Sequence, residues 1–187
     1  MINNRHREKL LNALVYFTSN VNHAGKTKLF KLLYSMDFLH FEKTGRSVTG
    51  LKYFAWEKGP VPVELYDEWK SPARDFNEAL TRTTKKISEE MTAHRLSARA
   101  EFNDIYFSEF QLSLMEELAK KHFNDTAEQM SMKSHEQFRP WSEVYEIRGQ
   151  PSAEIPYDLM LLRRGNERDM ELLSLAREYE AIGANYQ

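Results

Sequence analysis

The stretch from Gly25 to Gly45 constrains the fold more than any other part of the chain, because it predicts a helix that is apolar on two sides. One side carries Leu29, Leu32, Leu33, Met36, Leu39 and His40, and another carries Phe30, Tyr34, Asp37, Phe38 and Phe41. A helix of this kind is buried inside a domain. Gly45 is suited to the left-handed residue that ends a helix, and Lys43 places positive charge on the last turn. We therefore expect the other elements to pack around this helix.

The residues that follow predict a strand, a turn and a second helix. Leu51 to Glu57 is rich in aromatic residues, which favours a strand that is partly covered on both faces. We expect the run Gly59-Pro60-Val61-Pro62 to turn the chain, since each proline moves the residue before it away from helical dihedral angles. Pro62 is suited to the first position of a helix that continues from Val63.

Length and composition favour one domain with a real core. The chain has 187 residues, of which 41% are hydrophobic and 29% charged. The 26 basic and 28 acidic residues nearly balance, at a net charge of -2, so no overall basic footprint for nucleic acid is present. The absence of cysteine excludes disulfides, thiolate nucleophiles and cysteine-bound zinc. Apolar runs fall far short of the ~20 residues of a membrane helix, so we expect a cytoplasmic protein with no membrane segment.

Weaker patterns outline the rest of the chain. A first amphipathic helix is expected from about Asn4 to Asn20. The charged run that begins at Arg82 predicts a solvated helix or loop, and Met91 to Phe107 predicts one or two strands paired with the strand that holds Tyr53. These expectations give an α+β fold, mostly α-helical, with one small antiparallel sheet.

Helix caps mark the second half. Ser108 and Gln111 form a capping-box pattern, and Asp125 with Glu128 repeats the same logic before a short helix. Two further helices are expected, from Pro156 to Arg164 and from Asn166 to Ala184.

Motifs for chemistry are weak in this sequence. Gly25-Lys26-Thr27 lacks the first glycine and the preceding strand of a phosphate-binding loop. No two of the six histidines have metal-ligand spacing. Ser134-His135-Glu136 places three catalytic residue types in a row, but adjacent helical residues point in different directions and cannot act on one another. We therefore expect no catalytic residue, no metal site and no cofactor.

Asp37 lies on an aromatic side of the central helix, where a carboxylate is costly unless a cation or backbone donors meet it. Lys28, Lys31, Lys52 and Arg46 are the candidate cations. The interpretation we favour is an interior carboxylate that fixes how the helix docks. A role in a functional groove is the alternative.

Aromatic residues gather in sequence around the proline-rich run. They suit either plain core or a partner-binding patch, because Trp and Tyr dominate interface energetics and a pre-ordered turn loses little entropy on docking. The candidate partner-binding residues are Trp56, Lys58, Pro60, Pro62, Tyr66 and Trp69.

Two ordered blocks of residues carry a resemblance to a known family. The first is KTKLFKLLYSMDFLHFEKTGRSVTGLKYFAWEKGPVPVELYDEW, and the second joins Met132–Glu136, Pro140-Trp141 and Glu154–Tyr157. Together they resemble the Panacea, or SocA-like, antitoxin domain of bacterial and phage toxin-antitoxin operons, over about Leu10 to Leu162. The residues that carry this structural signature include Asp37, Gly50, Gly59, Ser134, His135 and Trp141.

The resemblance implies a non-enzymatic protein that binds another protein. It implies an antitoxin that neutralises a cognate toxin, encoded nearby, by direct contact, with an antitoxin domain at 1–164 and a C-terminal helical extension at 165–187. The alternatives are a proteolytic adaptor that delivers the toxin to a bacterial AAA+ protease, and a DNA-binding regulator of its operon, which the near-neutral charge disfavours. A hydrolase using His135 and Asp37 is the enzymatic alternative.

Overall fold

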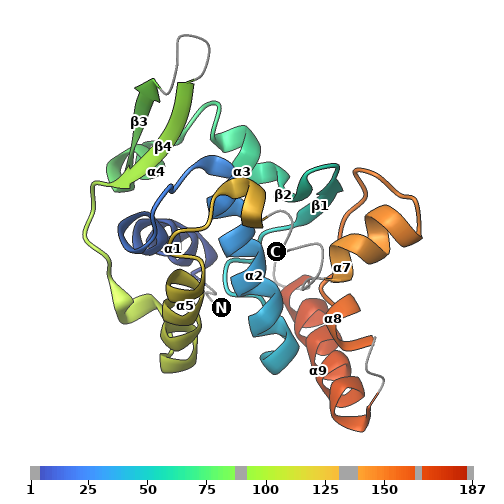
Figure 1. Ribbon diagram of the computed structural model, residues 1–187. Helices are drawn as coiled ribbons and strands as arrows, with labels where there is room; N and C mark the ends of the chain where they lie inside the picture. Colours follow the sequence, from blue (N-terminus) through green and yellow to red (C-terminus); the bar gives the residue numbers. More distant parts are fainter. Residues whose placement is uncertain (1–4, 87–91, 131–138, 163–165, 185–187) are drawn as a thin grey trace.

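The computed structural model describes residues 5–86, 92–130, 139–162 and 166–184 (Figure 1). In chain order the elements are α1 His6–Asn20, α2 Lys26–Thr44, β1 Tyr53–Trp56, β2 Gly59–Pro62, α3 Val63–Glu68, α4 Arg74–Ala79, β3 Leu80–Lys86, β4 Thr92–Ala98, the 3-10 turn η1 Asp104–Tyr106, α5 Glu109–Lys121, α7 Arg139–Ser142, the π-helical turn η2 Glu143–Ile147, α8 Leu159–Leu162 and α9 Glu167–Ala184. The fold is α+β and mostly helical, as the sequence predicts.

Helix α2 is the central element, and the prediction of a buried helix is confirmed. Every residue from Lys28 to Phe38 is buried. In Figure 1, α1 and α5 lie on one side of α2, and α7, α8 and α9 lie on the other. The helix ends where Gly45 adopts a left-handed φ of 69°. A Cβ at this glycine would lie 3.0 Å from the carbonyl oxygen of Leu172, so the tight approach of α9 also requires glycine here.

Two separate hairpins replace the single predicted sheet. Strand β1 pairs antiparallel with β2, with Tyr53 opposite Pro62 and Ala55 opposite Pro60. The run 59–62 is therefore a strand and not the predicted turn, which falls instead at residues 57–58. Proline lacks an N–H, so β2 can occupy only an edge of the sheet. The other edge of β1 binds residues 152–155, through the N–H of Ala55 to the carbonyl of Ala153 at 2.9 Å and neighbouring bonds.

The second hairpin corrects two predictions. The run from Arg82 lies in strand β3 and not in a helix or loop. Its partner is β4, so β4 does not pair with the strand of Tyr53 as expected. The β-branched residues Thr81, Thr83 and Thr84 favour a strand, and β1 already has a partner on each edge. Buried Leu80 and Leu96 fix the base of this hairpin on the core.

The two predicted capping boxes, one at the start of α5 and one after its end, are partly as predicted. The reciprocal hydrogen bonds of Ser108 and Gln111 confirm the first capping box. In the second, Thr126 and Gln129 exchange the reciprocal bonds, at 2.8 and 3.2 Å, instead of the predicted Asp125 and Glu128. Asp125 is engaged elsewhere, because its carboxylate lies 2.7 Å from the Nδ1 atom of His122.

Helices α8 and α9 pack on the C-terminal half of α2. Of the predicted helix from Pro156 to Arg164, the structure describes Leu159–Leu162 as helix α8, and Arg163 and Arg164 lie outside the described residues. A small second core joins Phe41 of α2, Leu161 of α8, and Leu173 and Ala176 of α9. In the described parts of the chain, each helix is too short or too polar to cross a membrane.

Candidate functional site

An aromatic pair stands at the junction of the β1–β2 hairpin and α3. Trp56 ends β1 and Tyr66 lies on α3, and both side chains are half-buried. Their ring centroids are 5.0 Å apart at an interplanar angle of 64°. The short turn at 57–58 and the paired β2 hold the two residues in this relation.

Two lysines extend this aromatic pair. The Nζ atom of Lys26 lies 4.2 Å from the centroid of the Tyr66 ring, and that of Lys70 lies 4.5 Å away. Lys70 also bonds Asp67 at 2.7 Å, which raises the pKa of its ammonium group. We call these residues, Trp56, Tyr66, Lys26 and Lys70, together with exposed Lys58 in the adjoining turn, the aromatic patch. Such a surface can offer flat apolar contact and positive charge to the same partner.

The other three predicted partner-binding residues support the patch from below. Trp69 is buried, with its ring 5.8 Å from Phe30 and 6.2 Å from Phe76. Pro60 and Pro62 are buried in β2. Lys58 is exposed, and its carbonyl oxygen accepts a 2.9 Å bond from the Nζ atom of buried Lys31. The structure therefore brings Trp56, Lys58 and Tyr66 to the surface and keeps Trp69 and the prolines inside.

Asp37 is fully buried and meets neutral donors rather than the expected cations. Its Oδ1 accepts the N–H groups of Val48 and Thr49, each at 2.8 Å. Its Oδ2 accepts the hydroxyls of Thr49 at 2.5 Å and Tyr53 at 2.7 Å. Burial raises the pKa of Asp37, and the four hydrogen bonds oppose that rise. The carboxyl group thus ties the loop after α2, and strand β1, to the central helix.

The candidate cations for Asp37 serve other groups. Lys52 bonds Glu154 at 3.4 Å, and the Arg46 guanidinium lies over the ring of Tyr179. Lys28 donates to the carbonyl oxygens of residues 22, 123 and 125 at 2.6 to 3.1 Å, and thereby joins the start of α2 to the end of α5. Burial lowers the pKa of Lys28 and of Lys31 to about 8. Sequence reasoning missed that these two lysines are buried, although both fall within the predicted buried helix.

His40 is held as a neutral imidazole. Its Nδ1 donates to the carbonyl of Arg46 at 2.7 Å, and its Nε2 accepts from the amide of Gln111 at 3.1 Å. Burial lowers the pKa of His40. The side chain therefore links α2 to α5 only while it is uncharged.

The signature residues have structural roles where the structure describes them. Gly50 has a φ of 71°, and a Cβ there would collide with the ring of His6. Gly59 has a φ of 109°. Trp141 is buried and donates from Nε1 to the carbonyl of Trp56 at 2.9 Å, so it supports the aromatic patch. Ser134 and His135, with the rest of Met132–Glu136, lie outside the described residues.

No metal site is formed among the described residues, since no group of three or more His, Asp or Glu side chains gathers there.

The aromatic patch and the interior carboxylate site differ in what they can bind. The carboxylate is committed to internal bonds, whereas Trp56 and Tyr66 present surface to solvent.

A comparison with protein-family models shows which part of the chain matches a known family. The family model described as "Antitoxin SocA-like, Panacea domain" matches residues 29–142, which is more than half of the chain. The match includes Asp37, the aromatic pair and Trp141, and it excludes α1, α8 and α9, so it is shorter than the expected range of 10–162. No curated protein and no solved structure matched the chain.

Proposed function

Because this chain belongs to the SocA-like Panacea antitoxin family, we propose that it is an antitoxin that neutralises a cognate protein toxin by direct binding. The family match over residues 29–142 is the observation that carries this proposal. The toxin is proposed to be the product of a neighbouring gene. We also propose that the antitoxin and its toxin bind one another in the cytoplasm.

We propose the aromatic patch as the contact made by the matched domain. Trp and Tyr supply large, rigid contact area at a small entropic cost, and they are enriched among residues that dominate binding energy. Trp56 and Tyr66 are already fixed against one another at 5.0 Å, so docking does not have to order them. The lysines over Tyr66 favour acidic groups around the corresponding site on the toxin.

The experiment that tests the function is co-expression with the product of the adjacent open reading frame. We expect that product to arrest growth when expressed alone. Growth should return when this chain is co-expressed, and the two proteins should co-purify in a fixed ratio. Rescue without a stable complex would contradict direct neutralisation.

Two substitutions test the surface. Trp56→Ala and Tyr66→Ala should each weaken binding by about 2 kcal/mol, or roughly 30-fold in Kd, if they are hot-spot residues. Tyr106→Ala is the matched control, because Tyr106 is also half-buried beside a cation, with Arg5 at 5.7 Å, on the distant turn η1. Equal effects at Tyr66 and Tyr106 would remove the patch from the proposal.

The same strains separate the alternatives. A proteolytic adaptor would lower the amount of toxin in the cell, and that loss would disappear in a strain without the AAA+ protease. Direct neutralisation leaves the toxin present in complex. Repression of the operon would appear as a gel shift with operator DNA that weakens steeply as salt is raised.

A further inference from the structure

Helix α9 lies outside the matched residues 29–142 and is held by a narrow buried strip. Leu173 and Ala176 face Phe41 and Leu161 in the small second core. Asp169 is also buried, where it exchanges hydrogen bonds of 2.9 Å with Asn166 at the start of the helix. Arg46 also lies over the ring of Tyr179. Among the α9 residues whose exposure the structure describes, most are exposed to solvent.

Large apolar side chains stand on both sides of that strip. Met170 is 50% exposed, Leu175 is 48% exposed and Tyr179 is 43% exposed. At about 100° per residue, Met170 lies on one side of Leu173 and Ala176, while Leu175 and Tyr179 lie on the other. A surface helix normally turns a single apolar stripe to the core. Helix α9 thus carries more apolar surface than its own domain covers.

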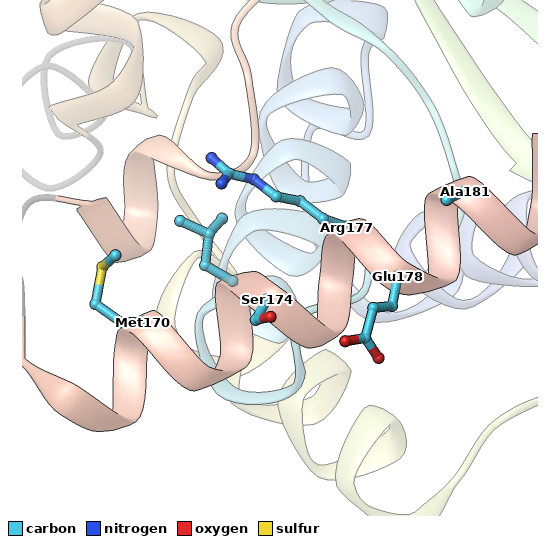
Figure 2. A pocket seen from close by; sticks show the side chains of 6 residues that line it. Met170, Ser174, Arg177, Glu178 and Ala181 are labelled. Carbon is cyan, nitrogen blue, oxygen red and sulfur yellow. The ribbon is translucent and has the colours of Figure 1, made fainter.

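The Met170 side of α9 also bears a shallow, open pocket. Its volume is about 390 Å³, and Figure 2 shows its side chains on successive turns of the helix. The residues that line it are Met170, Leu173, Ser174, Arg177, Glu178 and Ala181. This side therefore has room for side chains from another protein.

Charge indicates what kind of surface covers α9. The helix carries five acidic residues and two arginines, a net charge of -3, whereas the whole chain carries -2. The rest of the chain therefore carries +1, and the acidic excess is concentrated on this helix. Two copies of α9 placed together would bring like charges together, which disfavours self-association. A basic partner is electrostatically matched.

We propose that α9 is a docking helix that enters an apolar groove with a basic rim on the cognate toxin. This inference rests on the proposed antitoxin function. Binding of this type uses apolar anchors at helical spacing, while charges around them set the partner and the rate of encounter. Leu175 and Tyr179, four residues apart on one side of α9, are the anchors, and Glu171 and Glu178 are the exposed acidic residues between that side and Met170.

The apolar anchors are tested in the full chain against the product of the adjacent open reading frame, by calorimetry or interferometry at 0.15 M salt. Leu175→Glu and Tyr179→Ala should each raise the Kd at least tenfold and reduce rescue of growth. Ile105→Glu is the matched control, because Ile105 is 72% exposed on η1, and it should leave the Kd within twofold. Circular dichroism melts confirm that each variant is folded.

The acidic residues are tested by charge reversal. Compared with the wild type, Glu171→Lys and Glu178→Lys should each weaken binding and flatten the dependence of the Kd on salt between 0.05 and 0.5 M. Glu101→Lys changes the charge by the same amount at another exposed position and should leave both the Kd and the salt dependence close to those of the wild type.

The outcomes separate this inference from the proposed function. If the wild type binds and rescues but the α9 variants do so equally well, the docking helix is wrong and the antitoxin function stands. If sedimentation shows a wild-type dimer that the Leu175 variant loses, α9 binds a second copy and the inference is overturned. If the wild type itself neither binds nor rescues, both proposals fail together.

Discussion

The buried carboxylate of Asp37 makes a quantitative prediction about stability. Tyr53→Phe removes one hydroxyl that donates to Oδ2 of Asp37 at 2.7 Å and leaves the ring in place. The four donors that meet Asp37 favour its ionised form. A hydrogen bond to a charged group contributes about 1.5–3 kcal/mol, so we expect a loss of about 2 kcal/mol. For a chain of this length that lowers the Tm by about 4–8 °C. Urea unfolding and thermal melts at pH 7.5 measure both values.

Tyr157→Phe is the matched control. Its hydroxyl donates to the carbonyl oxygen of Leu51 at 2.6 Å, within the same aromatic cluster as Tyr53. A bond to a neutral acceptor contributes about 0.5–1.5 kcal/mol, so this variant should lose about half as much stability as Tyr53→Phe.

The dependence on pH sharpens the test. Burial raises the pKa of Asp37, so the carboxyl group contributes stability that is full below its ordinary pKa and is lost as the pH rises through its folded pKa. The Tyr53 hydroxyl limits that loss because it stabilises the ionised form. The difference between wild type and Tyr53→Phe should therefore shrink as the pH falls from 7.5 to 4, while the Tyr157→Phe difference stays constant. A flat Tyr53→Phe difference no larger than the control would refute this reasoning.

Two further predictions concern the residues around α2. Gly50→Ala should cost about 2–3 kcal/mol in urea unfolding, because strain at positive φ adds to a collision with His6. The control Gly149→Ala, at a φ of 59° with open space around it, should cost only about 1 kcal/mol. Equal costs for the two variants would contradict the collision. Burial lowers the pKa of His40, so its contribution is full above pH 6.5 and is lost as the pH falls toward the folded pKa. The stability advantage of wild type over His40→Gln should therefore decrease from pH 7.5 to 5, and an advantage that is constant over this range would show that His40 is not linked to folding.

In the candidate site, the sequence identified the group of residues, and the tertiary structure decided which of them are exposed. The sequence alone brought Trp56, Lys58, Tyr66 and Trp69 together as one group, because they lie close in the chain. It could not separate the exposed pair from buried Trp69, since exposure depends on what packs against each side chain. The Ser134-His135 block lies outside the described residues, so its role remains a prediction.

The sequence by itself determined the buried character of α2, its end at Gly45 and the capping box at Ser108. Each of these depends on the spacing or conformational preference of neighbouring residues. Only the tertiary structure decided that β1 pairs with β2 and with 152–155, that β3 pairs with β4, and that backbone and hydroxyl donors meet Asp37. Those choices depend on which distant segments arrive side by side, and many pairings are compatible with the same local preferences.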